Sequence, residues 1–457
     1  MSTITTLKAL YEKEKQSNLN DYFTFLRFKS IATDLAYKEE VLQCADWLSN
    51  YLKQCGLTVE KWETGRPAPT IFAQDLRAGP DKETLLIYCH YDVQPVDPLN
   101  EWTTPPFEPT QREGQIFARG ASDNKGQCFY TIIALKTLLK TRDRLPVNIK
   151  FLIEGEEESG SVGLSQIIES KKESLKADYL VIVDSGIEDM QTPAITLGAR
   201  GLVCFQICLQ EADYDLHSGQ AGGIAFNPNR ALAEMLSKLH DAEGKVTVPG
   251  FYDAVIPIPP HEKKAISFDF DQESFHNMFG FHPTGMEKGL SANEAAWIRP
   301  TLEINGMWGG YTGAGFKTVI PAKAHAKISC RLVPNQDPEI ITKQVKDFLR
   351  TLAPASMKLE IETLPGNGKG FRTDPQSRIV RLMSESYTQV FEKPCKNILI
   401  GGSIPISVQL CEAAQAEIVL VGLGLPDDHI HAPNEHFGLD RLEKGFLTIC
   451  RAIELFA

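Results

Sequence analysis

Short apolar runs recur along the chain, and the segments between them place apolar residues at helical spacing. Runs of this length are typical of strands that are buried on both faces of a parallel sheet. The five runs are residues 84–89, 147–153, 179–183, 397–400 and 416–421. Three segments repeat apolar residues every three to four positions, which predicts helices with one buried face: residues 38–55, 126–141 and 378–390. Strands that alternate with helices predict an α/β fold with a doubly wound, mostly parallel sheet.

The middle of the chain follows a different pattern. Residues 201–211 and 324–332 alternate apolar and polar side chains, which is the period of strands with one exposed face. Helix-like segments lie near residues 230–240 and 339–352, and residues 358–363 form a further strand pattern. Together these segments predict an α+β unit.

The length of the chain, 457 residues, exceeds what one ordinary core accommodates. We predict an α/β domain made of residues 1–197 and 369–457, with the α+β domain of residues 198–368 inserted between them. A Pro-rich stretch at residues 246–260 predicts irregular structure, and residues 246–295 carry no pattern from which a role can be predicted.

Charge and composition exclude several classes of protein. The formal net charge is −12 and no stripe of Lys and Arg is present, which argues against a nucleic-acid-binding surface. No stretch approaches the roughly 18 unbroken apolar residues of a membrane span, and residues 1–11 lack the apolar core of a signal peptide. The ten cysteines are scattered and include no C-x-x-C pair, so we expect buried, reduced thiols. We predict a soluble, cytoplasmic protein.

Acidic and histidine side chains follow the predicted strands, where functional groups gather in an open α/β sheet. These residues are His90, Asp92, Glu156, Glu157, Glu158, Asp184, Asp427, Asp428, His429 and His431, and Asp123 precedes a predicted helix. One such carboxylate commonly caps a helix or faces water. The whole set would place an unbalanced negative cluster at one edge of the sheet, which is costly unless a cation or protons neutralise it. A metal site is therefore the economical interpretation.

The ligand types narrow the choice of metal. Carboxylates and imidazoles without a nearby Cys suit Zn²⁺, Mn²⁺ or Co²⁺. The candidates exceed the needs of one open zinc site and suffice for two ions roughly 3.5–4 Å apart that share a bridging carboxylate. Such a pair polarises a carbonyl and lowers the pKa of a bound water, so we expect a hydrolase.

Eight short segments carry most of these residues in a fixed order. They are HYDVQP (90–95), GASDNKG (120–126), EESGS (157–161), Asp184, DLHSG (215–219), RLVPN (331–335), GGSIP (401–405) and HAPNE (431–435). Segment by segment, they resemble the motifs of the carnosinase and cytosolic non-specific dipeptidase family of co-catalytic di-zinc metallopeptidases, which has glutamate carboxypeptidases and aminoacylase as relatives. Each motif alone is weak to moderate, but the ordered set is highly specific.

The resemblance implies a set of metal ligands. His90 and Asp184 would bind one ion, Glu158 and His431 would bind the other, and Asp123 would bridge both. Zn²⁺ is the expected metal, with Mn²⁺ or Co²⁺ as alternatives. The inserted domain would then serve as a lid and dimerisation domain, and the α/β domain would be catalytic.

The resemblance also implies roles beside the metals. Glu157, adjacent to a ligand but unbound, would act as the general base that takes a proton from the metal-bridging water and delivers it to the leaving amine. Asp92 would accept a hydrogen bond from the second nitrogen of His90 and fix the tautomer of that ring. The peptide bond between Asp123 and Asn124 would be cis.

Two of these assignments have competitors in the sequence. The triplet of glutamates that begins at Glu156 invites a register error, and the following Ser-Gly-Ser favours Glu157 and Glu158. His429 competes with His431 as a ligand, and the Pro-Asn-Glu that follows favours His431.

The remaining candidates are implied to bind substrate. His217 would reach the active site of a neighbouring subunit and stabilise the oxyanion of the tetrahedral intermediate, which implies a homodimer. Arg331 would clamp a substrate carboxylate bidentately, although a surface ion pair is the alternative. Thr318 and Ser403 would be further hydrogen-bond donors.

These features favour a metal-dependent exopeptidase that hydrolyses dipeptides or short peptides. The alternative is an amidohydrolase of the same chemistry that deacylates N-acyl amino acids or a related terminal amide. A relative that only binds ligands is disfavoured, because every expected ligand and the base are present in the sequence.

Overall fold

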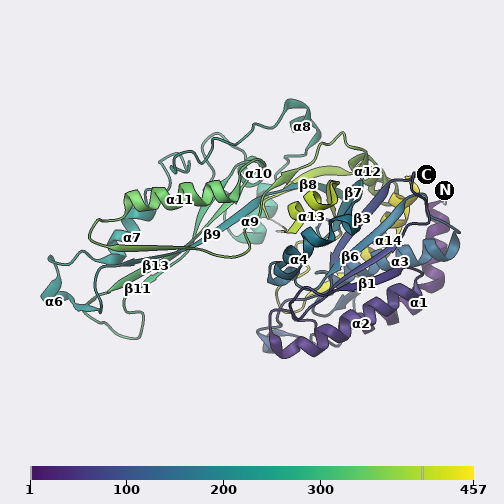
Figure 1. The fold of residues 1–457 in the computed structure, drawn as a ribbon, viewed down its shortest axis with the longest axis horizontal. Helices are drawn as coiled ribbons and strands as arrows, with labels where there is room; N and C mark the ends of the chain where they lie inside the picture. The colour runs from purple at the N-terminus through teal and green to yellow at the C-terminus, as the bar shows by residue number, and fades with distance from the viewer. Residues whose placement is uncertain (1–2, 403, 405) are drawn as a thin grey trace.

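The computed structural model describes residues 3–402, 404 and 406–457, which form two lobes arranged along the long axis of the molecule (Figure 1). Both chain ends lie in the larger lobe. Among the described residues, no helix has the length and apolar character that crossing a bilayer requires.

The larger lobe contains a nine-stranded mixed sheet in the order β1-β2-β6-β3-β7-β17-β8-β15, with β16 paired to β8. Its strands are β1 (Thr58–Trp62), β2 (Thr70–Asp75), β3 (Thr84–His90), β6 (Asn148–Glu154), β7 (Tyr179–Val183), β8 (Ala194–Ala199), β15 (Phe371–Arg372), β16 (Lys396–Ile400) and β17 (Glu417–Val421). All five predicted strands are present. The central neighbours β6, β3, β7 and β17 run parallel, whereas β2 and β8 pair antiparallel with β6 and β17. The α/β prediction is confirmed, with a parallel centre inside a mixed sheet.

Helices cover both faces of this sheet, which explains why its central strands are apolar on both sides. One face carries α1 (Ile4–Arg27), α2 (Lys38–Gln54), α3 (Lys125–Thr141), α12 (Arg378–Phe391) and α14 (Leu439–Glu454). The other face carries α4 (Val162–Ile167), α5 (Lys172–Leu175) and α13 (Ile406–Ala414). Along β3, Leu85 and Ile87 pack into the first layer while Leu86 and Tyr88 pack into the second, as strand alternation requires.

The smaller lobe contains a four-stranded antiparallel sheet in the order β11-β13-β9-β14. Its strands are β9 (Gly201–Gln210), β11 (Thr301–Gly309), β13 (Lys323–Leu332) and β14 (Lys358–Thr363), and it packs against α7 (Pro228–Leu236) and α11 (Pro338–Leu352). The buried residues of β9 alternate with partly exposed ones, in agreement with the sequence pattern. The chain leaves the large sheet after Ala199 and re-enters it at Phe371. The domain limits near residues 198 and 368 stay a prediction.

Part of the segment without a predicted role packs on the larger lobe. It forms α8 (Pro260–Ala265), α9 (Gln272–Phe279) and α10 (Ala292–Trp297). Ile266 belongs to the core between the large sheet and its helices, and Phe268 and Trp297 pack against that core. This segment therefore returns to the α/β lobe although it lies within the inserted region of the sequence.

Short elements complete the chain. A three-stranded sheet joins β4 (Thr110–Arg112), β5 (Gln115–Phe117) and β18 (His436–Gly438), and a two-stranded sheet joins β10 (Leu216–His217) and β12 (Val319–Ile320). The remaining short helical elements are α6 (Ser218–Ala221) and the 3-10 turns η1 (Leu35–Tyr37), η2 (Leu99–Glu101), η3 (Glu157–Ser159) and η4 (Ile168–Lys171).

Candidate active site

The candidate residues converge beyond the carboxyl ends of the parallel strands. His90 ends β3, where it is in register with Glu154 at the end of β6. Asp184 directly follows β7, and Glu157 and Glu158 lie in η3 after β6. Because these strands run parallel, their ends meet at one edge of the sheet, which is where open α/β sheets bind ligands.

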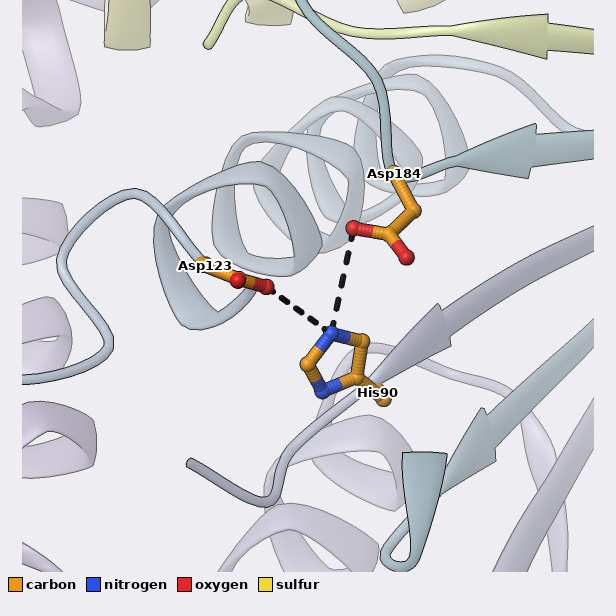
Figure 2. Close-up of side chains that lie close together, drawn as sticks. All are labelled: His90, Asp123 and Asp184. Atoms are coloured by element: carbon orange, nitrogen blue, oxygen red, sulfur yellow. Dashed lines mark hydrogen bonds and ion pairs between the residues drawn. The ribbon is translucent and has the colours of Figure 1, made fainter. Parts of the chain in front are cut away.

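One cluster joins His90, Asp123 and Asp184 (Figure 2). Nε2 of the buried His90 lies 3.1 Å from Oδ1 of Asp123 and 3.8 Å from Oδ1 of Asp184. The three side chains come from the end of β3, the loop before α3 and the segment directly after β7, and they point toward one another.

A second cluster joins Asp123, Glu158 and His431. Nε2 of the half-exposed His431 lies 2.9 Å from Oδ2 of Asp123 and 3.3 Å from Oε2 of Glu158. Asp123 therefore directs one carboxylate oxygen to each cluster. In each cluster the possible ligand atoms lie within 4.8 Å of one another.

The donor set suits two divalent cations that share Asp123. Each cluster offers one imidazole nitrogen and two carboxylates, which Zn²⁺ and related ions accept. In addition, Oε1 of Glu158 is buried and accepts no hydrogen bond from any residue that the structure describes. A buried carboxylate oxygen without a partner is costly, and a cation would satisfy it.

The carboxylates of the clusters repel one another. Burial raises the pKa of Asp184 to about 7; His90 opposes this rise, and the negative charges of Asp123 and Glu158 increase it. Burial likewise raises the pKa of Glu158. Hydrogen bonds to Asp123 and Glu158 raise the pKa of His431 to about 10. Two imidazoles thus offset part of the negative charge, and bound cations would offset the rest.

Asp92 connects the first cluster to η3. Its buried carboxylate accepts hydrogen bonds from the backbone N–H of Glu157, at 3.2 Å, and of Glu158, at 3.0 Å. The same carboxylate lies 3.3 Å from Nδ1 of His90. Asp92 therefore holds the turn that carries Glu157 and Glu158 and can orient the His90 ring.

Glu157 has the electrostatic properties of a proton-transfer group. Burial raises its pKa well above the usual range; His90 opposes this rise, while the charges of Asp184 and Glu158 increase it. A carboxylate with a raised pKa is a stronger base than an ordinary carboxylate, which is the property that proton transfer from a water requires.

Glu156 has other partners. Its carboxylate lies 3.0 Å from Nε of Arg66 and accepts a hydrogen bond from the N–H of Gly163. This residue is absent from both clusters, whereas Glu158 belongs to the second. The geometry therefore agrees with the register that the following Ser-Gly-Ser favours.

His429 also lies apart from the two clusters of described residues. Its ring meets that of His436 edge-on, with centroids 5.6 Å apart. His429, His431 and Asn434 all have positive φ, at 56°, 60° and 64°. Left-handed backbone at non-glycine residues is uncommon and clusters at functional sites, which sets the loop that carries His431 apart from ordinary turns.

Glu435 was not singled out in the sequence, although it ends the HAPNE motif. Its buried carboxylate accepts hydrogen bonds from the N–H groups of Gly120, Ser122 and Asp123, at 2.7, 2.9 and 2.9 Å. Nη1 of the buried Arg119 donates a further bond at 2.8 Å. Glu435 therefore fixes the backbone of the loop that presents Asp123.

Asn124 is a second residue without a predicted side-chain role. Its amide donates hydrogen bonds to the carbonyl oxygen of Val183 and to Oδ1 of Asp184. The peptide bond that joins Asp123 to Asn124 is cis, as the resemblance implied.

The candidates of the inserted region do not join the two clusters. His217 and Thr318 lie together, because the N–H of Ser218 donates to the carbonyl of Thr318 next to the β10-β12 pair. The neighbouring α6 lies at the end of the smaller lobe that is remote from the large sheet (Figure 1). Arg331 lies near the end of β13. Ser403 lies outside the described residues.

Comparisons with known proteins place the chain in a family. Residues 86–455 match the model of peptidase family M20/M25/M40. The chain is 30% identical over 470 residues to the Cys-Gly metallodipeptidase dug1 of Schizosaccharomyces pombe, covering 99% of this chain and 98% of that protein. It is 34% identical over 377 residues to the Beta-Ala-His dipeptidase of Homo sapiens, covering 81% and 74%.

A solved structure agrees with these matches. The M20 family metallo-carboxypeptidase Sso-CP2 of Sulfolobus solfataricus superposes with a TM-score of 0.85 at 34% identity, covering 96% of this chain and 99% of that one. The family that the sequence motifs indicated is thereby confirmed: the chain belongs to peptidase family M20/M25/M40 and is a metallopeptidase.

Proposed function

We propose that this protein is an exopeptidase that hydrolyses dipeptides or short peptides with two divalent metal ions. The observation that carries this proposal is the position of Asp123 between two clusters, each with one histidine and one further carboxylate. His90 and Asp184 would hold one ion and Glu158 and His431 the other. Zn²⁺ is the expected metal, with Mn²⁺ and Co²⁺ as alternatives. The names of the dipeptidase relatives support a dipeptide as substrate.

When bound, the two ions would polarise the scissile carbonyl and make the attacking water more acidic. Glu157 would take the proton of that water and return it to the leaving amine. Asp92 would hold η3 and the His90 ring in place through the contacts described above. Arg331, Thr318 and Ser403 would bind the substrate.

A second copy of the chain would complete the site. His217 accepts a hydrogen bond at Nδ1 from the N–H of Gly219, so its Nε2 is the nitrogen left to donate to an oxyanion. The location of α6, remote from the large sheet, favours a role in a partner's site.

The edge of the small sheet supports such a homodimer. Strand β11 is an edge strand, and its side chains Ile304, Met307 and Trp308 are exposed. Exposed apolar edge strands invite pairing with another chain. The ten free cysteines agree with the proposed cytoplasmic location, because reduced thiols persist there.

A substrate panel tests the proposal. Purified protein loaded with Zn²⁺, Mn²⁺ or Co²⁺ is incubated with dipeptides, tri- and tetrapeptides, and N-acyl amino acids, and released amino acids are quantified. We expect dipeptides to be cleaved fastest. Action on N-acyl amino acids alone would refute the peptidase proposal in favour of the deacylase alternative. Successive release of residues from the carboxyl end of longer peptides would indicate a carboxypeptidase.

A further inference from the structure

A cavity of about 620 Å³ adjoins the first metal-ligand cluster. Asp123 and Asp184 line it, so it opens onto the site where the proposed chemistry takes place. Its volume falls within the roughly 300–1,000 Å³ that is usual for small-molecule sites. If a peptide binds at the metal ions, one of its side chains can therefore extend into this cavity.

The wall on the α/β side is largely apolar. Ile187, Ile398 and Leu425 contribute side chains to it. Gly186 and Gly424 bring their two backbones together there, and a Cβ at Gly186 would lie 2.6 Å from the carbonyl oxygen of Gly424. Glycine at this position keeps the segment after β7 close to the loop after β17, beside the cavity.

A further part of the lining comes from α9, in the segment for which the sequence predicted no role. Asp271 caps this helix by accepting from the N–H groups of Glu273 and Ser274, and Gly280 ends it with φ of +79°. Phe275 packs against Phe279, with ring centroids 4.8 Å apart. Helix α9 is thus a well-capped element that presents aromatic side chains to the cavity.

Several of these apolar side chains remain exposed. Met278 is 56% exposed and Phe279 57%, and Ile430, from the loop that carries His431, is 51% exposed. All three line the cavity. Covering such side chains with another apolar group removes apolar area from water, which is favourable.

The charged groups of the lining argue against an acidic occupant. Glu188, Asp269 and Asp271 line the cavity, in addition to the two aspartates whose charge bound cations would offset. Lys396 is the cation among the lining residues, and Asp269 lies 3.3 Å from its Nζ. An acidic side chain would meet several carboxylates and one amine that is already paired.

We propose that this cavity is a specificity pocket for a large apolar side chain, aromatic or branched aliphatic, of the dipeptide substrate. Helix α9 and Ile430 close over that side chain. The inference rests on the proposed peptidase function and names the substrates that this peptidase prefers. Dipeptides of small or acidic residues are correspondingly poorer substrates.

Kinetics with matched dipeptides test the pocket. The wild-type metal-loaded protein is assayed with Ala-Gly, Leu-Gly, Phe-Gly and Glu-Gly and with the reversed series. In one of the two series we expect kcat/KM for the Phe or Leu dipeptide to exceed that for the Ala dipeptide by about 10-fold or more, the range that apolar pockets supply. The Glu dipeptide should be the poorest of that series.

Variants of α9 make the test specific. Met278→Ser and Phe279→Ser should lower kcat/KM for the Phe and Leu dipeptides more than for the Ala dipeptide, so that the preference for bulky over small residues falls several-fold. Met278→Trp, which narrows the cavity, should lower the rate on the Phe dipeptide more than that on the Ala dipeptide. Ile256→Ser is the control, because Ile256 is 57% exposed in the same inserted region and does not line the cavity.

The possible outcomes separate the pocket from the reaction. Cleavage of all dipeptides without a size preference overturns the pocket and leaves the peptidase proposal standing. The same holds if the α9 variants keep the wild-type preference, or if Ile256→Ser lowers it equally. Failure of the wild-type protein to cleave any dipeptide overturns both.

Discussion

Glu157 and Glu158 are adjacent in the sequence, yet they have different surroundings. Oε2 of Glu158 faces His431, whereas Glu157 belongs to neither ligand cluster and has a strongly raised pKa. The neighbouring Glu156 is paired with Arg66. Because the three adjacent glutamates have different surroundings, substituting them one at a time tests the proposed base directly.

We expect Glu157→Gln to keep its metal and to lose turnover by about 10²–10⁴-fold, because general base catalysis contributes on that order. Elemental analysis gives the metal content, and single-substrate kinetics give kcat. Glu156→Gln is the matched control and should keep most of its turnover. If Glu157→Gln remains nearly as active as the wild-type protein, the proposed base is wrong.

Glu435 also acts at the scale of a single residue, through backbone N–H groups and the side chain of Arg119. Replacing it by Gln would place an amide N–H₂ against N–H donors and leave Arg119 buried without its carboxylate. Breaking a buried charge pair costs about 3–5 kcal/mol. Glu435→Gln should therefore lower the midpoint of urea unfolding and weaken metal binding by about 10–100-fold, the usual loss when a group that supports metal ligands is removed.

Metal titration followed by calorimetry, with circular dichroism to verify folding, checks this prediction. Arg378→Gln is a useful control, because Arg378 pairs with Glu83 at the surface and exposed pairs contribute little. A Glu435→Gln protein that binds metal as tightly as the wild-type protein would show that the loop before Asp123 is held by other contacts.

The residue roles differ in how far the sequence predicts them. His90, Asp184 and Glu158 are candidates because strand ends converge at one edge of a parallel sheet, and their division between two ions is what the family resemblance implies. The roles of Glu435 and Asn124 were not found, because they depend on the directions of backbone amides and carboxylates in the folded loops. No spacing of residue types encodes that Glu435 meets the N–H groups of Gly120 and Ser122.

At the scale of elements, apolar runs predicted strands best where both faces are covered. Strand β7 is buried along its whole length, and its apolar run matches the strand limits. Helix α1 was not predicted, because its buried stripe is interrupted by Asn18, whose side chain accepts a hydrogen bond from Lys136 of α3. When a buried polar residue finds its hydrogen-bond partner on another helix, it interrupts the apolar periodicity from which its own helix could be predicted.

The ends of β3 and β6 are joined by a buried carboxyl group. The hydroxyl groups of Tyr88 and Ser161 donate to Oε2 of Glu154, and Oε1 has no partner among the described residues. Burial is the main cause that raises the pKa of Glu154 from 4.5 to about 8. A pKa of about 8 favours the protonated group in the folded protein at neutral pH, whereas the unfolded chain favours the ionised group.

This difference predicts how stability depends on pH. Because the pKa of Glu154 is higher in the folded than in the unfolded state, protonation of this group stabilises the fold. This stabilisation is complete below the unfolded-state pKa and is lost as pH rises through the folded-state pKa. The free energy of unfolding of the metal-free protein should fall by roughly 2–3 kcal/mol from about pH 6 to pH 8 through this group. Urea unfolding at both values measures it.

Glu154→Gln supplies the comparison, because the amide has the same shape and does not ionise. We expect this variant to be less sensitive to pH over the same interval. Equal pH dependence in the variant and the wild-type protein would mean that Glu154 is ionised in the fold, and that the pH dependence comes from other groups.

At the scale of the whole molecule, the sequence predicted two kinds of sheet but not their placement. The alternating pattern of β9 revealed a separate antiparallel sheet. It did not reveal that α8–α10 return to the α/β lobe, because Ile266 and Trp297 acquire their partners only in the folded protein. Nor does any pattern in the sequence give the position of His217 relative to the metal-ligand clusters of its own chain.

Complementation between two inactive variants tests whether His217 acts in a partner's site. His217→Ala and Glu157→Gln proteins are mixed under conditions in which subunit exchange is demonstrated by labelled chains. A mixed dimer then has one site with both residues intact. At equal mixing about a quarter of wild-type activity should return, because half of the dimers are mixed and each has one complete site of two.

The control for this experiment combines two substitutions at residues that one chain contributes to its own active site. Asp123 and Glu157 come from one chain and serve the same clusters, so every site in a mixture of Asp123→Asn and Glu157→Gln proteins keeps a lesion. No activity should return in that mixture. Exchange without recovery in the His217→Ala mixture would contradict the action of His217 in trans. The catalytic site would then have to be completed within one chain, by closure of the smaller lobe onto the larger.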